Sequence, residues 1–151
     1  MGYFKNKSEP FFREIRRIEI YDASAVTFEN NFKNVFPDPS LAKHVFDVIP
    51  ETFIRKIPTK KSSGSYSFDP DFGFPLLDMS KVNVDLLFAD FNREGFAVVL
   101  VSNIQKTLIG NDQEPLTVEI IDNVKDDNSG NDEYSISITG STIIYPKFAS
   151  I

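Results

Sequence analysis

The chain has 151 residues, of which 41% are hydrophobic and 25% charged, and it contains no cysteine. This length and composition indicate one folded domain over residues 1–151, and the lack of cysteine excludes disulfide frameworks, thiolate nucleophiles and cysteine-bearing zinc or iron–sulfur sites. The net charge of −6 makes nucleic acid a poor partner, because binding it requires an excess of lysine and arginine.

The charge is distributed unevenly along the chain. Residues 1–61 carry 11 basic and 8 acidic groups, a net of +3, whereas residues 62–151 carry 5 basic and 14 acidic groups, a net of −9. Opposite signs in the two parts allow copies to attract each other head to tail, or one end to bind a partner of opposite charge. Surface charge without a partner is the alternative interpretation.

The first residues do not look like a targeting segment. The stretch MGYFKNKSEPFF lacks the apolar centre of a signal peptide, and the longest apolar run, FAVVLV at 96–101, is far shorter than the ~20 residues of a membrane-spanning helix. We therefore expect a cytoplasmic or virion protein that makes no membrane contact. Residues 1–10 are a candidate docking arm.

One or two short helices are expected in the N-terminal third. The segment from Ser8 favours a short helix to about Arg17 and then a strand to Tyr21, although the apolar spacing there is ambiguous. The segment 36–50 predicts a second helix. Asp38 can cap its first turn and Pro39 fits the first helical position. The apolar stripe of this second helix consists of Leu41, Val45 and Val48, with Phe46 and Ile49 beside it.

The middle of the chain is expected to be irregular. Residues 51–57 either extend the preceding helix or begin a strand. Residues 59–80 predict a long irregular loop, because Pro70 and Pro75 cannot donate to a strand ladder and Gly73 permits unusual backbone angles.

Strands dominate from residue 82 onward. The stretch 82–88 alternates like a strand, although a helical stripe at 84, 87, 88 and 91 competes. The nearly continuous apolar run from Phe96 predicts a strand covered on both faces. Further strands are expected at 116–121, 134–140 and 141–150, the last ending near Pro146. The predicted fold is α+β, with a mainly antiparallel sheet of about five or six strands in the C-terminal two thirds.

The acidic stretch 122–133 raises the question of cation binding. Aligned on Gly130, an EF-hand pattern would place Lys125 at the first ligand position and Ile136 at the last, where carboxylates are required. The weak metal candidates Asp126, Asp127 and Asp132 would therefore form a less regular site. A solvated hairpin connection is the favoured interpretation.

Catalytic motifs are sparse, and no cofactor is expected. His44 is the only histidine, which removes most acyl-transfer mechanisms unless it is the base. Asp69 and Asp71, on an aromatic stretch, are the candidate acids of a carboxylate-dependent hydrolase. A turn built by these aspartates is the plainer alternative.

Aromatic residues lead to the main functional hypothesis. The chain has 15 Phe and 5 Tyr, more ring surface than a small core is expected to bury, so some rings should contact other chains. The candidate interface residues are Tyr3, Phe4, Phe11, Phe12, Arg16, Arg17, Phe72, Phe74, Tyr145 and Phe148. We expect a non-enzymatic assembly protein that binds copies of itself or other subunits, such as a phage neck, tail or capsid-associated component. A β-rich cation- or ligand-binding module is the alternative, and the hydrolase is a third.

Overall fold

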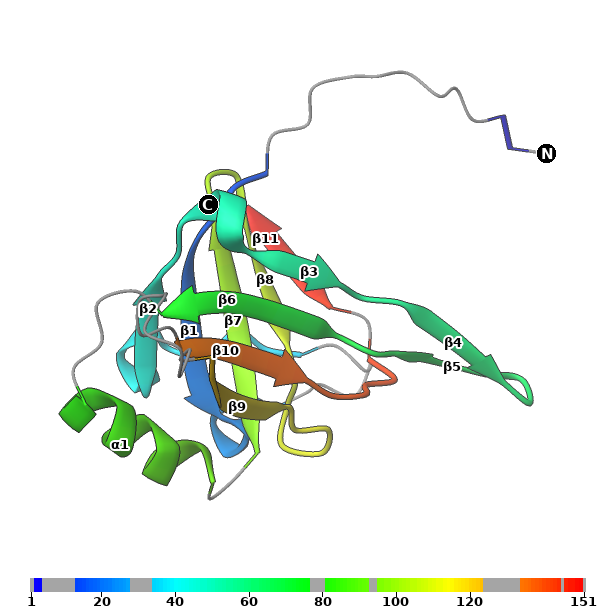
Figure 1. The fold of residues 1–151 in the computed structure, drawn as a ribbon. Helices are drawn as coiled ribbons and strands as arrows, with labels where there is room; N and C mark the ends of the chain where they lie inside the picture. Colours follow the sequence, from blue (N-terminus) through cyan, green and yellow to red (C-terminus); the bar gives the residue numbers. More distant parts are fainter. Residues whose placement is uncertain are drawn as a thin grey trace.

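The computed structural model describes residues 2–3, 13–27, 34–76, 81–92, 95–123, 134–144 and 146–150, with only the backbone at 81–84. These residues form two antiparallel sheets that pack around a shared core, and a hairpin that projects from one end (Figure 1). The mainly antiparallel sheet predicted from the sequence is confirmed.

The larger sheet has five strands in the order β11-β8-β7-β1-β2. Its members are β1 (Ile15–Asp22), β2 (His44–Asp47), β7 (Phe96–Ser102), β8 (Gln105–Ile109) and β11 (Lys147–Ser150). β1 pairs with β7 in a register that sets Ile18 opposite Leu100. The pairing makes β1 an interior strand of the sheet, between β7 and β2.

The smaller sheet has four strands in the order β3-β6-β10-β9. Its members are β3 (Ile54–Lys56), β6 (Asp71–Leu76), β9 (Thr117–Asp122) and β10 (Tyr134–Thr139). Isolated bridges pair Phe96 with Leu116 and Phe68 with Thr142 at the margins of the strands.

The core lies between the two sheets. Ile18 and Leu100 of the larger sheet share it with Phe72, Phe74 and Ile138 of the smaller one. A second cluster covers the opposite face of the larger sheet, where Val99 and Leu108 pack under Phe36. All seven residues of β7 are buried, as predicted for a strand covered on both faces.

One α-helix is present in the described part of the chain, α1 (Lys81–Phe91). It packs beside β9 and buries Leu87 and Phe91, which are four positions apart and so share a helical face. The described chain also has single 3-10 turns, η1 (Ala23–Ala25), η2 (Pro39–Leu41) and η3 (Pro50–Thr52). No helix among the residues described here is long and apolar enough to cross a membrane.

The two N-terminal helices predicted from the sequence are wrong. β1 begins at Ile15, where the first helix was expected to be ending, and residues 8–12 lie outside the described residues. In the second segment Asp38 does cap a first turn, accepting from the Ser40 backbone N–H at 3.0 Å. The helix stops after that turn, because the chain continues into β2 and its backbone bonds are made with β1.

The long irregular loop is also wrong for the residues described. Residues 59–76 form β4 (Thr59–Ser62), β5 (Ser65–Phe68) and β6. Phe72, Phe74 and Leu76 alternate inward along β6, which outweighs the proline. β3 pairs with β6 only as far as Gly73, so Pro75 has a described strand neighbour on one side alone, where proline is tolerated.

Of the later elements, the strands at 116–121 and 134–140 correspond to β9 and β10 and are confirmed. The strand favoured at 82–88 is instead part of α1. The last strand follows Pro146 rather than ending there, and β8 was not predicted.

Candidate interaction site

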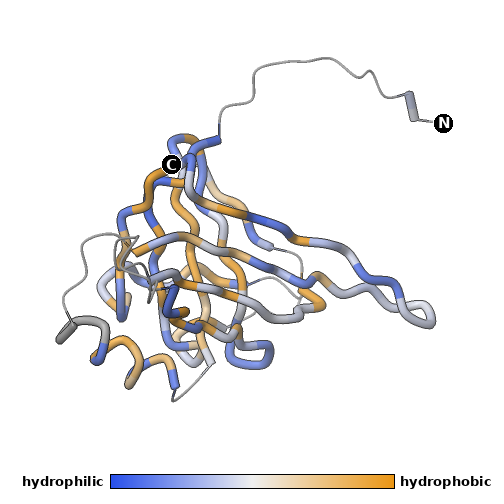
Figure 2. Tube along the Cα trace, in the orientation of Figure 1, coloured by the Kyte–Doolittle hydropathy of each residue, from blue (hydrophilic) through white to orange (hydrophobic). Residues whose placement is uncertain are grey.

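The hairpin formed by β4 and β5, residues 59–68, is here called the hairpin arm. It continues the direction of β3 and β6 beyond the edge of the body (Figure 1), and residues 59–66 are exposed. Its turn places Ser63 at φ 44° and Gly64 at φ 84°, the left-handed angles of a tight two-residue hairpin. Figure 2 shows the arm as hydrophilic to neutral, unlike the apolar strands of the core.

The arm is basic. Its sequence, TKKSSGSYSF, contains Lys60 and Lys61 and no acidic residue. Lys61 faces Tyr66 across the hairpin, with its Nζ 5.7 Å from the ring centroid, so the cation lies over an exposed aromatic ring.

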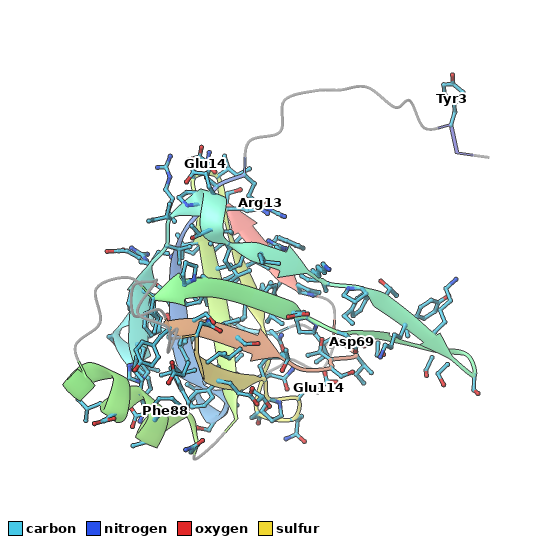
Figure 3. The ribbon with its side chains drawn as sticks, in the orientation of Figure 1. Tyr3, Arg13, Glu14, Asp69, Phe88 and Glu114 are labelled. Carbon is cyan, nitrogen blue, oxygen red and sulfur yellow. The ribbon has the colours of Figure 1, made fainter. Side chains whose placement is uncertain are left out.

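An ion pair fastens the arm at its base. Lys60 Nζ lies 2.7 Å from Asp69 Oδ2, and Figure 3 shows Asp69 where the arm joins the body. The hydrogen bond from Lys60, with another from Ser141, holds the pKa of Asp69 below its usual value. The same pair raises the pKa of Lys60.

A hollow of about 580 Å³ lies on the outer face of the smaller sheet. We call it the outer groove and define it by Ile54, Gly73, Pro75, Ile121, Ser135 and Ser137. Its floor is low because the central side chains are small: the register sets Gly73 opposite Ile54 on one side and Ser137 on the other. Ile54 and Ile121 rise at the rims, where their side chains are 63% and 42% exposed.

Two acidic side chains lie on the same face as the outer groove. Asp71 lines it, and Glu119 lies directly opposite Ser137 on the neighbouring strand, so both belong to this outer face. Lys56, on β3, lies opposite Asp71 and partly offsets the negative charge of the two acids. The face thus combines an apolar hollow with two exposed carboxylates and one cation.

Two other surface features involve apolar residues. A hollow of about 410 Å³ beside β11 is lined by Arg13, Arg55, Ile57, Thr59, Phe68, Pro146 and Phe148. Exposed aliphatic side chains also gather in the segment that carries β2, the edge strand of the larger sheet: Leu41, Val45 and Ile49.

The predicted interface residues divide into three groups. Phe72 and Phe74 are 0% and 2% exposed, so placing them at a surface was wrong: they form the core under the outer groove. Tyr3 and Phe148 are exposed, and Figure 3 shows Tyr3 apart from the sheets. The remaining aromatic candidates lie outside the described residues: Phe4, Phe11, Phe12 and Tyr145.

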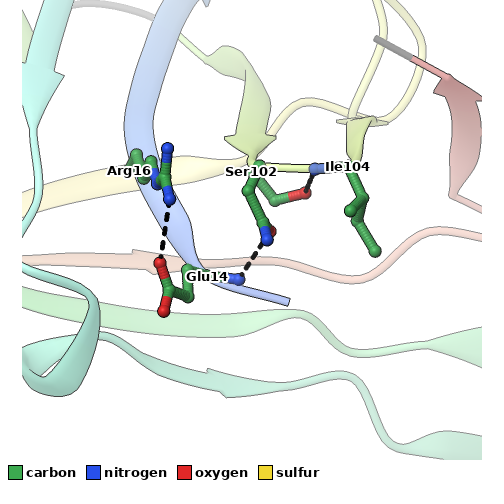
Figure 4. A network of polar contacts seen from close by, with 5 residues as sticks. Glu14, Arg16, Ser102 and Ile104 are labelled. Atoms are coloured by element: carbon green, nitrogen blue, oxygen red, sulfur yellow. Dashed lines mark hydrogen bonds and ion pairs between the residues drawn. The ribbon is translucent and has the colours of Figure 1, made fainter. Parts of the chain in front are cut away.

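Each of the two candidate arginines binds an acid two residues away in the chain. Arg16 Nη2 is 3.1 Å from Glu14 Oε2, beside the turn in which Ser102 Oγ accepts from the Ile104 backbone N–H (Figure 4). Arg17 Nη2 is 3.1 Å from Glu19 Oε2. Glu19 is buried and also accepts from the Tyr21 hydroxyl at 2.9 Å, and burial with this contact raises the pKa of Tyr21 above its usual value.

Most of the described phenylalanine side chains are buried or half-buried within the single chain. Of the ten phenylalanines described, four are buried, four half-buried and two exposed, Phe88 and Phe148. Among the described residues, few phenylalanine rings are therefore left at the surface for contact with another chain.

The candidate metal ligands and catalytic residues are considered next, for the part of the chain that the structure describes. No group of three or more His, Cys, Asp or Glu side chains there could hold a metal ion. Asp126, Asp127 and Asp132, the weak metal candidates, lie outside the described residues. The ion pair lowers the pKa of Asp69, the opposite of what a general acid needs. His44 lies in β2 rather than in a helix, bonded to Asp90.

Sequence reasoning missed both the hairpin arm and the outer groove. An isolated glycine inside an alternating stretch, Gly73 between Phe72 and Phe74, was the available signal for the groove, because such glycines mark bulges or close approach by another group. Comparison with protein-family models, curated proteins and solved structures finds no match to this chain.

Proposed function

We propose that the protein is a non-enzymatic assembly subunit, which works by binding copies of itself or other subunits of a larger complex. The observation that carries this proposal is the hairpin arm. Ordered strands cost conformational entropy that burial normally offsets, yet this hairpin lies outside the body with residues 59–66 exposed. An isolated two-stranded hairpin is only marginally stable in water, so contact with another molecule would stabilise the arm.

Further features support the same proposal. The outer groove and the exposed aliphatic residues near β2 offer apolar area away from the arm. The chain also carries net charges of opposite sign before and after residue 61. Multi-copy particles use subunits of this kind, and we propose a virion, at a phage neck, tail or capsid, as the setting.

Sedimentation velocity and native mass spectrometry of the purified full chain, over a wide concentration range, test the proposal. We expect defined oligomers whose population rises with concentration, and imaging of particles from the native source should place the chain within them. A strict monomer at the highest concentration, absent from any particle, would contradict the proposed function.

A further inference from the structure

We infer that the hairpin arm of one copy binds the outer groove of the next copy, in a head-to-tail contact. This inference deepens the proposed function and rests on it. The partner is a second copy of this chain, and the contact pairs two surfaces that differ from each other.

The shape of the outer groove suits the tip of the arm. Tyr66 is exposed near the tip of the arm, and the outer groove has a hollow centre because Gly73 carries no side chain. A Cβ at Gly73 would meet only the Ile136 carbonyl oxygen, at 3.7 Å, so nothing in the described residues crowds that point. A tyrosine ring laid over a glycine, between Ile54 and Ile121, would bury apolar area on both sides.

The charges of the two surfaces are of opposite sign. Lys60 is already paired with Asp69 at the base, so the arm brings Lys61 as its cation, while the groove face carries Asp71 and Glu119 against Lys56. Because the Lys61 ammonium lies over the Tyr66 ring, a ring placed over Gly73 would bring this cation toward the two carboxylates of the groove face. Attraction between unlike charges fixes the orientation of such a contact and speeds encounter.

The arm points away from the groove of its own chain. The arm leaves the sheet at the end where β3 stops and β6 begins, and the hairpin of β4 and β5 extends away from the body (Figure 1). Pro75 and Thr52, at the far end of the groove, lie where β6 ends and β3 begins. An arm of four residues per strand, about 13 Å long, cannot turn back onto its own groove without breaking its strands.

The contact is therefore heterologous. Each copy has one arm and one groove, so binding repeats and produces a closed ring or an open filament. A single hairpin buries a modest area, so we expect each contact to be weak and its products to form at high protein concentration.

Two variants of the full chain test this, each damaged on one side only. Tyr66→Ser removes the ring of the arm and leaves the groove intact. Gly73→Val fills the groove and leaves the arm intact, and valine suits the strand backbone at this position. Each variant alone should self-associate at least about tenfold more weakly than the wild type, the usual effect of losing a central aromatic contact.

An equimolar mixture gives the decisive result. One intact arm, on Gly73→Val, can bind one intact groove, on Tyr66→Ser, so native mass spectrometry should show mixed dimers and no longer species. Circular dichroism checks the fold, and Ile54→Lys is the second groove variant should Gly73→Val unfold. Ile104→Ser, at an exposed isoleucine in the turn between β7 and β8, is the matched control and should assemble normally.

Each other outcome overturns the inference. If the wild type assembles and the single variants assemble equally well, the arm and groove do not meet, while the proposed function stands. Weakened variants that do not rescue each other on mixing would exclude a head-to-tail contact. A wild type that stays monomeric at every concentration would overturn both this contact and self-assembly.

Discussion

His44 Nε2 lies 2.9 Å from Asp90 Oδ2, which joins edge strand β2 to helix α1. The His44 ring also meets Phe91 edge to face, with centroids 5.4 Å apart. Residues 46 positions apart thus fix the helix against the sheet. The histidine that sequence analysis considered as a base therefore has two structural partners, Asp90 and Phe91, both on α1.

Replacing Asp90 with alanine should weaken this attachment. We expect a loss of about 1 kcal/mol in the free energy of unfolding, the usual net value of a half-exposed hydrogen bond, measured by urea denaturation at neutral pH. Asp85→Ala, at an exposed acid on the same helix, is the matched control. Equal effects of the two substitutions would show that the bond to His44 is not what matters.

Glu114 links the connection between β8 and β9 to the connection between β10 and β11. Its carboxylate accepts from the backbone N–H of Ile143 at 2.6 Å and from that of Ile144 at 3.3 Å. Glu114→Ala leaves both donors without this partner, so we expect a loss of about 1–3 kcal/mol in unfolding free energy. Gln113→Ala, at the exposed neighbouring position, should change stability by less than about 0.5 kcal/mol. A stable Glu114→Ala protein would mean that water replaces the carboxylate.

Two glycines with similar backbone angles should respond differently to substitution. Gly64 has φ 84° and a Cβ there meets nothing within 4 Å, so Gly64→Ala should cost only about 1 kcal/mol of left-handed strain. Gly110 has φ 92° and its Cβ would lie 3.1 Å from the Phe96 carbonyl oxygen and 3.2 Å from Ala97 Cα. Gly110→Ala should therefore cost about 2 kcal/mol or more. Thermal denaturation of the pair checks this, and equal losses would contradict it.

Strands whose apolar residues follow a regular pattern were predictable from the sequence. In β9 and β10 the apolar residues alternate, and in β7 they are continuous, so local pattern and tertiary position agree. The segment around β2 shows where this fails. Leu41, Val45 and Ile49 recur every four residues, a spacing that is one helical turn and also two strand repeats. Pairing with β1 decides between them, and no local pattern reports it.

The candidate site was harder to predict than the fold. The hairpin arm is mostly polar and residues 59–66 are exposed, so it has no hydrophobic periodicity to detect. The outer groove depends on which small residues become neighbours across strands. Gly73 and Ser137 are 64 positions apart, and only the register of β6 with β10 brings them together.

The ion pair at the base of the hairpin arm should make its order depend on pH at both extremes. The folded pKa of Asp69 lies below the usual 3.8, so the stability it contributes is present above that value and is lost as the pH falls through the folded pKa. The folded pKa of Lys60 lies above 10.5, so its contribution is present below that value and is lost as the pH rises through the folded pKa.

Amide NMR signals of the arm, at Lys61 and Tyr66, report this directly. In the wild type they should lose their dispersed strand shifts in strong acid before the core signals of β7 do. Asp69→Asn should lack that acid step and hold a less ordered arm at neutral pH, because the carboxylate that accepts from Lys60 and Ser141 is gone. Asp71→Asn, two residues along the chain, is the control and should keep the wild-type acid step. An arm that melts with the same acid profile in wild type and Asp69→Asn would show that the pair does not hold it, and that other contacts set its direction toward a neighbouring copy.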